Sequence, residues 1–260
     1  MREFFGLGGY QRPAEGFLSP EHLTFATFLM VVMVVSAILL GLRNKNRPME
    51  KKNTVLMGTA LIINAFEIFK IVMISIRAKN PYEFIYMLPL FLCSIQLIAI
   101  PMAALCKGRL KEASLDFVCI FGILGAVFGV YFAGQNYSCY PVLSLDNVVS
   151  GITRSISGFA SLYILISGMT SMKKQNMVIT FSILLGFCVA AYATNVLIDY
   201  NYMFLMRGDG TPYDILFNLF DGSKVLYPLS VVALFLIYIT GYYLVYFAVT
   251  RHSKKPAAAQ

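Results

Sequence analysis

Long apolar runs separated by short polar segments dominate the pattern along the chain. Seven runs are each long enough to cross a bilayer, because about 20 apolar residues in a helix span the hydrocarbon core. They cover residues 23–42, 55–76, 86–106, 115–133, 152–169, 178–200 and 226–249. The pattern therefore predicts an all-α fold, a polytopic membrane bundle of seven transmembrane helices.

The second run, residues 55–76, carries two charged residues well inside its ends. Each charge near the bilayer centre costs at least about 2.5–3.5 kcal/mol. Glu67 and Lys70 are three residues apart, so they share one helix face with Asn64 one turn earlier. We expect this face to be turned away from lipid, either as a structural ion pair or as part of a functional site.

Basic residues in the connecting segments predict the orientation of the bundle. One set of loops, together with the tail, carries almost twice as many basic residues as the other set. Its members are Arg43, Lys45, Arg47, Lys51, Lys52, Lys107, Arg109, Lys111, Lys173, Lys174, Arg251, Lys254 and Lys255. The positive-inside rule makes this side cytoplasmic and the N-terminus external. We thus expect an extracytoplasmic segment over residues 1–22, a membrane domain over 23–249 and a basic cytoplasmic tail over 250–260.

Composition supports this reading and excludes other classes of protein. Hydrophobic residues make up 58% of the chain and the mean hydropathy is +0.70, which is not typical of a soluble domain. The net charge of +8 is explained by loop lysines and arginines, so no nucleic-acid partner is implied. Neither a metal-ligand spacing nor a phosphate-binding glycine loop is present, and no cofactor is expected. The expected location is the cell membrane, with membrane lipids as partners.

Two further patterns predict local packing. Gly122, Gly125 and Gly129 share a face of the fourth run, where small residues let another helix approach closely. Between the last two runs, Thr211 and Pro212 can open a short helix that ends near Phe220. One apolar face predicts that this short helix lies at the outer interface as a partial lid.

Polar residues inside the runs gather at one predicted depth, in the outer half of the membrane. They are His22, Glu67, Lys70, Cys93, Gln96, Arg154, Asn195 and Asp199. This common depth favours a cavity open toward the outer leaflet, walled by residues 55–76, 86–106 and 178–200. The alternative is a set of separate helix–helix hydrogen bonds, which is the usual role of single Asn and Gln residues in membranes.

Several segments resemble the YwaF-type integral membrane proteins. They are SPEHLTF at Ser19 to Phe25, LPLFLCSIQ around Cys93, ISG at Ile166 to Gly168, and NYMFLMRGDGTPYDILFNLFDGSKVLYPLS from Asn201. The last block is the most specific, and its Tyr202 joins the set of expected cavity residues. The family is related to the vertebrate transmembrane protein 164 phospholipid acyltransferases, which use a catalytic Cys and His. The resemblance implies that Cys93 occupies the cysteine position.

The chain departs from the family pattern at the expected histidines. Phe91 stands where members often have His, and Arg154-Ser155-Ile156-Ser157 occupies the outer end of the fifth run without one. The usual Cys–His pair is therefore incomplete, and whether the protein is an enzyme stays open. Arg154 can stabilise a thiolate but cannot act as a base, which leaves His22 as the candidate base.

Three functions remain open from the sequence. The first is lipid handling at the outer leaflet, including phospholipid acyl transfer by resemblance. The second is binding or transport of a small polar or amphipathic solute, supported by the intramembrane charges. The third is a non-catalytic structural subunit of a membrane assembly.

Overall fold

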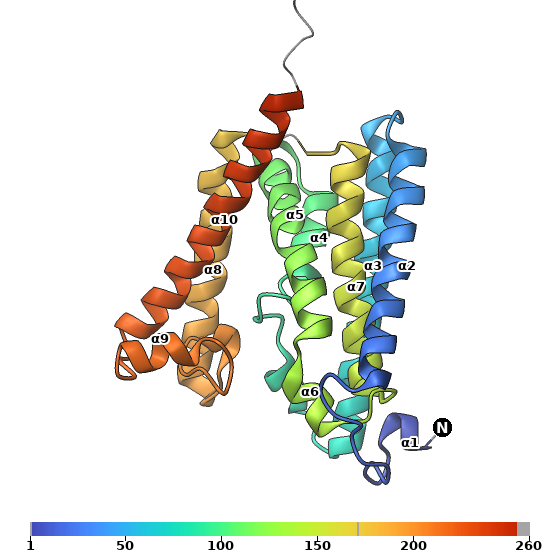
Figure 1. The fold of residues 1–260 in the computed structure, drawn as a ribbon, viewed down its shortest axis with the longest axis vertical. Helices are drawn as coiled ribbons and strands as arrows, with labels where there is room; N and C mark the ends of the chain where they lie inside the picture. The colour runs from blue at the N-terminus through green and yellow to red at the C-terminus, as the bar shows by residue number, and fades with distance from the viewer. Residues whose placement is uncertain (1, 171, 254–260) are drawn as a thin grey trace, which may run out of the picture. The chain divides into compact units, whose positions relative to one another are not determined.

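The computed structural model describes residues 2–170 and 172–253, and all regular secondary structure in these ranges is helical. The helices group into two compact units, Met1–Thr170 and Ser171–Gln260, and each is described by itself (Figure 1). The first unit contains α1 (Arg2–Phe5), α2 (Pro20–Asn44), α3 (Met49–Ala78), η1 (Glu83–Met87), α4 (Gln96–Leu105), α5 (Gly108–Tyr131), α6 (Gly134–Cys139) and α7 (Leu145–Ser167). The second unit contains α8 (Lys174–Ile198), η2 (Tyr202–Phe204), α9 (Asp214–Leu219) and α10 (Leu226–Ser253).

Six helices in the described residues are long and apolar enough to cross a membrane. They cover Pro20–Asn44, Met49–Ala78, Gly108–Cys139, Leu145–Ser167, Lys174–Ile198 and Leu226–Thr250. Each coincides with one of the runs predicted from the sequence. The all-helical membrane fold is therefore confirmed, but a seventh spanning helix is not.

The third predicted run, residues 86–106, is broken in the structure. Only Gln96–Leu105 is α-helical, and 10 residues are too few to span the hydrocarbon core. Pro89 lacks a backbone N–H and restricts the residue before it, so Leu88 is extended with φ −60° and ψ 149°. The chain then turns, with the N–H groups of Ser94 and Ile95 both donating to the Phe91 carbonyl. Pro89 thus interrupts a helix that hydropathy alone predicts to be continuous, whereas Pro101 lies inside α4 without ending it.

The central helix of the first unit is α7, which contacts α2, α3 and α5 (Figure 1). Its ends follow from local sequence. The Ser144 hydroxyl caps the first turn by accepting from the Asn147 N–H at 3.3 Å, and Gly168 ends the helix with φ +68°. On the α2 side, Ala26, Leu29, Met30 and Met33 form an apolar cluster with Ala126 and Val130 of α5.

Small residues bring α5 and α7 into close contact, as the sequence predicts for the glycine face. A Cβ atom added to Gly122 would lie 2.6 Å from the Ser157 carbonyl oxygen. A Cβ added to Gly158 would lie 2.6 Å from the Ala126 Cβ and would clash with the Met33 Sδ. The predicted role of the glycines in helix packing is therefore confirmed.

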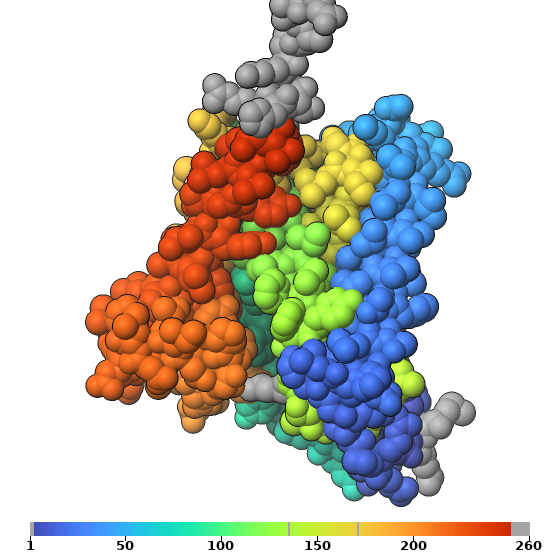
Figure 2. Space-filling view, viewed as in Figure 1, coloured from blue at the N-terminus to red at the C-terminus, as the bar shows by residue number. Residues whose placement is uncertain are grey.

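The N-terminal segment before α2 packs against one end of the first unit. Figure 2 shows these residues in dark blue, at the end of α2 where the chain enters that helix. A carboxylate oxygen of Glu15 accepts from the Val142 N–H at 2.7 Å. Burial opposes ionisation of Glu15, but this hydrogen bond and the neighbouring Arg12 outweigh it, so the pKa of Glu15 is lowered. The segment is thus attached by specific polar contacts.

In the second unit, α8 packs on α10 and the connection between them is ordered. The hydroxyls of Thr180 and Tyr243 lie 3.2 Å apart across the two helices. The predicted short helix forms as α9, six residues long, with Ile215 and Leu219 about 70% exposed. The short helix and its exposed apolar side chains are therefore confirmed, while its position at the outer interface as a partial lid stays a prediction.

The glycine contacts predict opposite effects for the same substitution at two helical sites. Gly122→Ala should destabilise the protein by about 1–3 kcal/mol, because the added methyl group meets backbone of α7. Gly58→Ala in α3 is the matched control, since no described atom lies within 4 Å of an added Cβ there. This control should be neutral or stabilising by about 0.5–1 kcal/mol. Thermal unfolding in detergent measures both, and equal effects would contradict the packing.

Candidate functional site

A small pocket lies inside the first unit between α3, the start of α4 and α7. Its volume is about 40 Å³, which is room for about three water-sized groups. The lining residues are Ile63, Glu67, Lys70, Cys93, Ser94, Leu97, Ser150, Thr153, Arg154 and Ser157. Four of them belong to the set of site residues proposed from the sequence: Glu67, Lys70, Cys93 and Arg154. The pocket therefore brings together side chains from three separate runs.

The two charges of α3 form an ion pair in this pocket. The Lys70 Nζ lies 2.6 Å from the Glu67 Oε1, and their side chains are 15% and 11% exposed. One turn earlier, the Asn64 amide donates to the Leu97 carbonyl at 3.1 Å. The polar face of α3 is thus turned toward α4, as expected from the cost of exposing it to lipid.

Cys93 belongs to the irregular segment that precedes α4. A Cβ added to Gly125 would lie 3.3 Å from the Cys93 Cβ, so the missing side chain lets this segment approach α5. The Cys93 Sγ lies 3.9 Å from the Ser94 hydroxyl oxygen, and the thiol is half-buried. The break in the third run therefore presents the thiol to the pocket from a non-helical turn.

Arg154 enters the pocket from α7. Its guanidinium donates to the Gly129 carbonyl, and a Cβ at Gly129 would lie 2.7 Å from the Arg154 Cδ. Among the described residues, no carboxylate forms an ion pair with Arg154. The guanidinium is therefore held by a helix carbonyl, with no acidic partner in this part of the chain.

The polar face of α7 was missed by the sequence analysis, although a signal for it exists. Ser150, Thr153 and Ser157 line the pocket with Arg154, at the spacing i, i+3, i+4 and i+7 of one helix face. The hydroxyls of Thr153 and Ser157 donate to carbonyls one turn back, at 3.1 and 3.0 Å. A polar stripe at this spacing in an apolar run indicates a face that is turned inward.

Gln96 and His22, two other candidate residues, do not line the pocket. Gln96 begins α4 with its side chain fully buried, and no described residue is within hydrogen-bonding distance of its amide atoms. The His22 Nδ1 accepts from the Leu18 N–H at 3.1 Å, which assigns the proton to Nε2, 2.9 Å from the Val130 carbonyl. Both ring nitrogens are engaged, and the ring centroids of His22 and Tyr137 lie 3.8 Å apart, so these contacts favour a structural role for His22.

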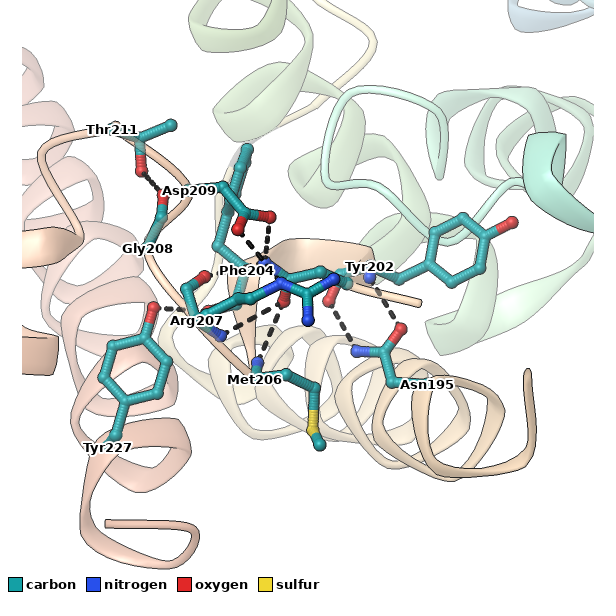
Figure 3. Close-up of polar contacts among 10 residues, drawn as sticks. Asn195, Tyr202, Phe204, Met206, Arg207, Gly208, Asp209, Thr211 and Tyr227 are labelled. Carbon is teal, nitrogen blue, oxygen red and sulfur yellow. Dashed lines mark hydrogen bonds and ion pairs between the residues drawn. The ribbon is translucent and has the colours of Figure 1, made fainter. Parts of the chain in front are cut away.

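The remaining candidates, Asn195, Asp199 and Tyr202, lie in the second unit, and Figure 3 shows Asn195 and Tyr202. The Asn195 side chain pairs with the Tyr202 backbone, accepting from its N–H at 2.6 Å and donating to its carbonyl at 3.0 Å. Asp199 ends α8 in the left-handed region, with φ +50°. These residues therefore shape the turn that follows α8.

Asn201, which is not among the site residues predicted from the sequence, organises the loop after this turn. Its side chain accepts from the Met206 N–H at 2.9 Å and donates at 2.7 Å to both the Arg207 carbonyl and the Asp209 carboxylate. The Tyr227 hydroxyl of α10 donates to the Phe204 carbonyl at 2.7 Å (Figure 3). The most specific block of the sequence is thus a loop stabilised by its own polar groups.

A second polar cluster, which we call the clasp, joins Tyr10, Arg77 and Asp146. Two guanidinium nitrogens of Arg77 donate to the two carboxylate oxygens of Asp146 at 2.7 and 2.8 Å. The Tyr10 hydroxyl donates to Asp146 at 2.6 Å and accepts from Arg77 at 2.9 Å. Burial, then the hydrogen bond to Asp146 and its negative charge, raise the pKa of Tyr10 to about 12.

The clasp lies next to the pocket along both helices. Arg77 follows Lys70 by two turns of α3, and Asp146 precedes Ser150 by one turn of α7. Among the described residues, no three His, Cys, Asp or Glu side chains gather as metal ligands would. The polar groups that the pocket of this unit brings together include the Cys93 thiol, the Glu67–Lys70 pair and the Arg154 guanidinium.

The buried ion pair predicts an asymmetry between single and double substitutions. Glu67→Gln should cost about 3–5 kcal/mol, because it leaves Lys70 buried without its counter-charge. The double change of Glu67 to Gln and Lys70 to Met should cost less. Arg207→Gln is the control, since Arg207 pairs with Asp209 at 53% side-chain exposure and should cost at most about 1 kcal/mol. Unfolding in detergent measures all three, and an unchanged Glu67→Gln would refute burial of the pair.

The clasp predicts that the Tyr10 phenol ionises at a higher pH in the folded protein than in the unfolded chain. Its pKa is raised from 10.0 to about 12, so folding favours the neutral phenol. The stabilisation is complete below pH of about 10 and is lost as pH rises to about 12. The tyrosinate absorbance of the native protein minus that of Tyr10→Phe should show one step near pH 12. In denaturant the step should move to about pH 10, and a native step already at that pH would disprove the contact.

Comparison with known proteins identifies the chain at the level of family. A family model described as the TMEM164 family matches residues 17–251, which include every pocket-lining residue and the loop of Figure 3. No curated protein sequence and no solved structure is detectably similar to the chain. The family match extends over most of the 260 residues and agrees with the six apolar helices. The chain is therefore a multi-pass integral membrane protein that belongs to the TMEM164 family.

Proposed function

We propose that this protein handles lipids at the outer leaflet of the cell membrane and transfers acyl groups through Cys93. The observation that carries the proposal is that Cys93, Arg154 and the Glu67–Lys70 pair line one pocket. The resemblance to phospholipid acyltransferases with a catalytic cysteine supports the same residue. The excess of basic residues in one set of loops supports an external N-terminus and a cytoplasmic C-terminus.

The proposed reaction needs only a phospholipid as donor and a lysophospholipid as acceptor. The Cys93 sulfur attacks the ester carbonyl of the donor, the ester C–O bond breaks, and an acyl thioester forms. The departing alkoxide takes up the proton that the thiol gave, and leaves as a lysophospholipid. The hydroxyl of a second lysophospholipid then attacks the thioester, and its proton returns to the sulfur. No redox change occurs, and every atom is accounted for.

The pocket offers substitutes for the missing catalytic histidine. Glu67 is a carboxylate that can hold the thiol proton, because general bases in enzymes include Glu as well as His. Arg154 cannot take a proton, but its guanidinium can stabilise the negative charge that develops on the ester carbonyl oxygen. Lys70 lies 2.6 Å from Glu67 and supplies its counter-charge. In this proposal Cys93 is the nucleophile and His22 has no catalytic role.

The size of the pocket limits which part of a lipid can enter. Room for about three water-sized groups is enough for an ester O–C=O group but not for an acyl chain. The chains would therefore stay in the bilayer beside apolar helix faces, while the ester reaches Cys93.

A second candidate is binding or transport of a small polar or amphipathic solute without covalent chemistry. The buried ion pair favours it, because intramembrane charges often mark solute or ion pathways. A covalent intermediate separates the two candidates, since only acyl transfer forms one. A purely structural role would give neither an intermediate nor uptake into proteoliposomes.

Acyl transfer predicts a thioester on Cys93. An alkyne-tagged phospholipid delivered to the outer leaflet of intact cells should label the protein, and hydroxylamine should remove the label because it cleaves thioesters. Cys93→Ser should abolish labelling, and Glu67→Gln should slow it by about 10²–10⁴-fold if Glu67 is the general base. Labelled peptides identified by mass spectrometry give the modified residue.

Two other cysteines provide matched controls. Cys106 is half-buried like Cys93, and Cys139 is exposed, so replacing either by serine should leave the labelling intact. Labelling that persists in Cys93→Ser, or that appears only when the lipid reaches the inner leaflet, would contradict the proposal. Lipids that copurify with an unlabelled protein would then favour binding without chemistry.

A further inference from the structure

The pocket carries more positive than negative charge. Glu67 and Lys70 balance each other at 2.6 Å, which leaves the guanidinium of Arg154. Within residues 2–170 and 172–253, no carboxylate pairs with it, and it donates instead to the neutral Gly129 carbonyl. A cation inside a membrane-spanning helix is costly unless an anion or a strong dipole compensates it. The Gly129 carbonyl stabilises the guanidinium but carries no net charge, so the pocket keeps a net positive charge that favours an anionic ligand.

The pocket is suited in size and in hydrogen-bond donors to one small oxyanion. A carboxylate has three heavy atoms, and the volume admits about three water-sized groups. Arg154 presents a planar set of five N–H donors, of which the Gly129 carbonyl takes one. Ser150 adds a hydroxyl one turn away on the same face of α7. The hydroxyls of Thr153 and Ser157 already donate to helix carbonyls, so recognition depends on the cation.

We propose that this pocket binds a single carboxylate group, with Arg154 as its counter-charge. The carboxylate is carried either by a fatty acid in the bilayer or by a small acid in water. The inference rests on the proposed function only in treating the pocket as a ligand site, and it does not require a reactive Cys93. A planar carboxylate accepts two parallel hydrogen bonds from a guanidinium, which gives Arg154 an advantage over Lys at this position.

Ligand-dependent thermal stability of the purified protein tests the carboxylate site. Oleate should raise the unfolding temperature in detergent in a saturable way, whereas oleyl alcohol, with the same chain and no charge, should not. Arg154→Gln should weaken the apparent affinity for oleate at least about tenfold, because it removes a charge-assisted hydrogen-bonded pair. Arg109→Gln is the matched control, since Arg109 is an exposed cation of the first unit and should leave the affinity unchanged.

Two additional measurements complete the test. Acetate identifies the source of the carboxylate, and a second substitution of Arg154 covers the case in which the first variant does not fold. Acetate that stabilises the protein as much as oleate would support a soluble acid as the ligand, and oleate alone would support a fatty acid. Arg154→Lys keeps the charge but loses the planar donors, so it should bind oleate severalfold more weakly even if Arg154→Gln cannot be purified. Equal effects of oleate and oleyl alcohol, or undiminished oleate affinity in either Arg154 variant, would overturn the proposal.

The Cys93→Ser variant distinguishes this inference from acyl transfer. It should lose the thioester label while still being stabilised by oleate and not by oleyl alcohol, because the carboxylate contacts Arg154. Loss of oleate binding in Cys93→Ser would overturn a carboxylate site that is independent of the thiol. A wild-type protein that binds oleate but forms no thioester would retain this inference and refute the proposed reaction.

Discussion

The absence of water in the hydrocarbon core is the constraint on which the first unit depends. Every charge and every irregular backbone segment at that depth must find its partner within the protein. Lys70 meets Glu67, the Arg154 guanidinium meets a helix carbonyl, and the break before α4 is covered by the glycine face of α5. These three contacts surround one pocket. The groups that must be shielded from lipid are therefore also groups of the candidate site.

Close helix packing makes this arrangement possible. Gly122 lets the backbones of α5 and α7 touch, Gly125 makes room for the Cys93 segment, and Gly129 makes room for the Arg154 side chain. One stripe of small residues therefore serves both the core and the pocket. Because glycine has no side chain that could change its rotamer, the groups that pack on this stripe must fit the backbone of α5 directly.

Much of this fold follows from local patterns in the sequence, and the rest depends on distant contacts. Run length and hydropathy located six helices, and the charge spacing of Glu67 and Lys70 predicted their pairing. The same criteria predicted too long a helix for the third run, because hydropathy takes no account of the backbone N–H that Pro89 lacks. The burial of His22 against Tyr137 and Val130 could not be predicted, since it joins positions more than a hundred residues apart. Of the candidate site, the sequence predicted Glu67, Lys70, Cys93 and Arg154, but not the three hydroxyl residues that share the α7 face with Arg154.

The clasp has a consequence for the order in which the first unit is assembled. Tyr10 and Arg77 converge on Asp146, which lies 136 and 69 positions after them. Because synthesis proceeds from the N-terminus, both residues leave the ribosome well before their common acceptor. The first two membrane helices must therefore be inserted while Arg77 still lacks its carboxylate. The N-terminal segment, although made first, reaches its final contacts only after the beginning of α7 has been added.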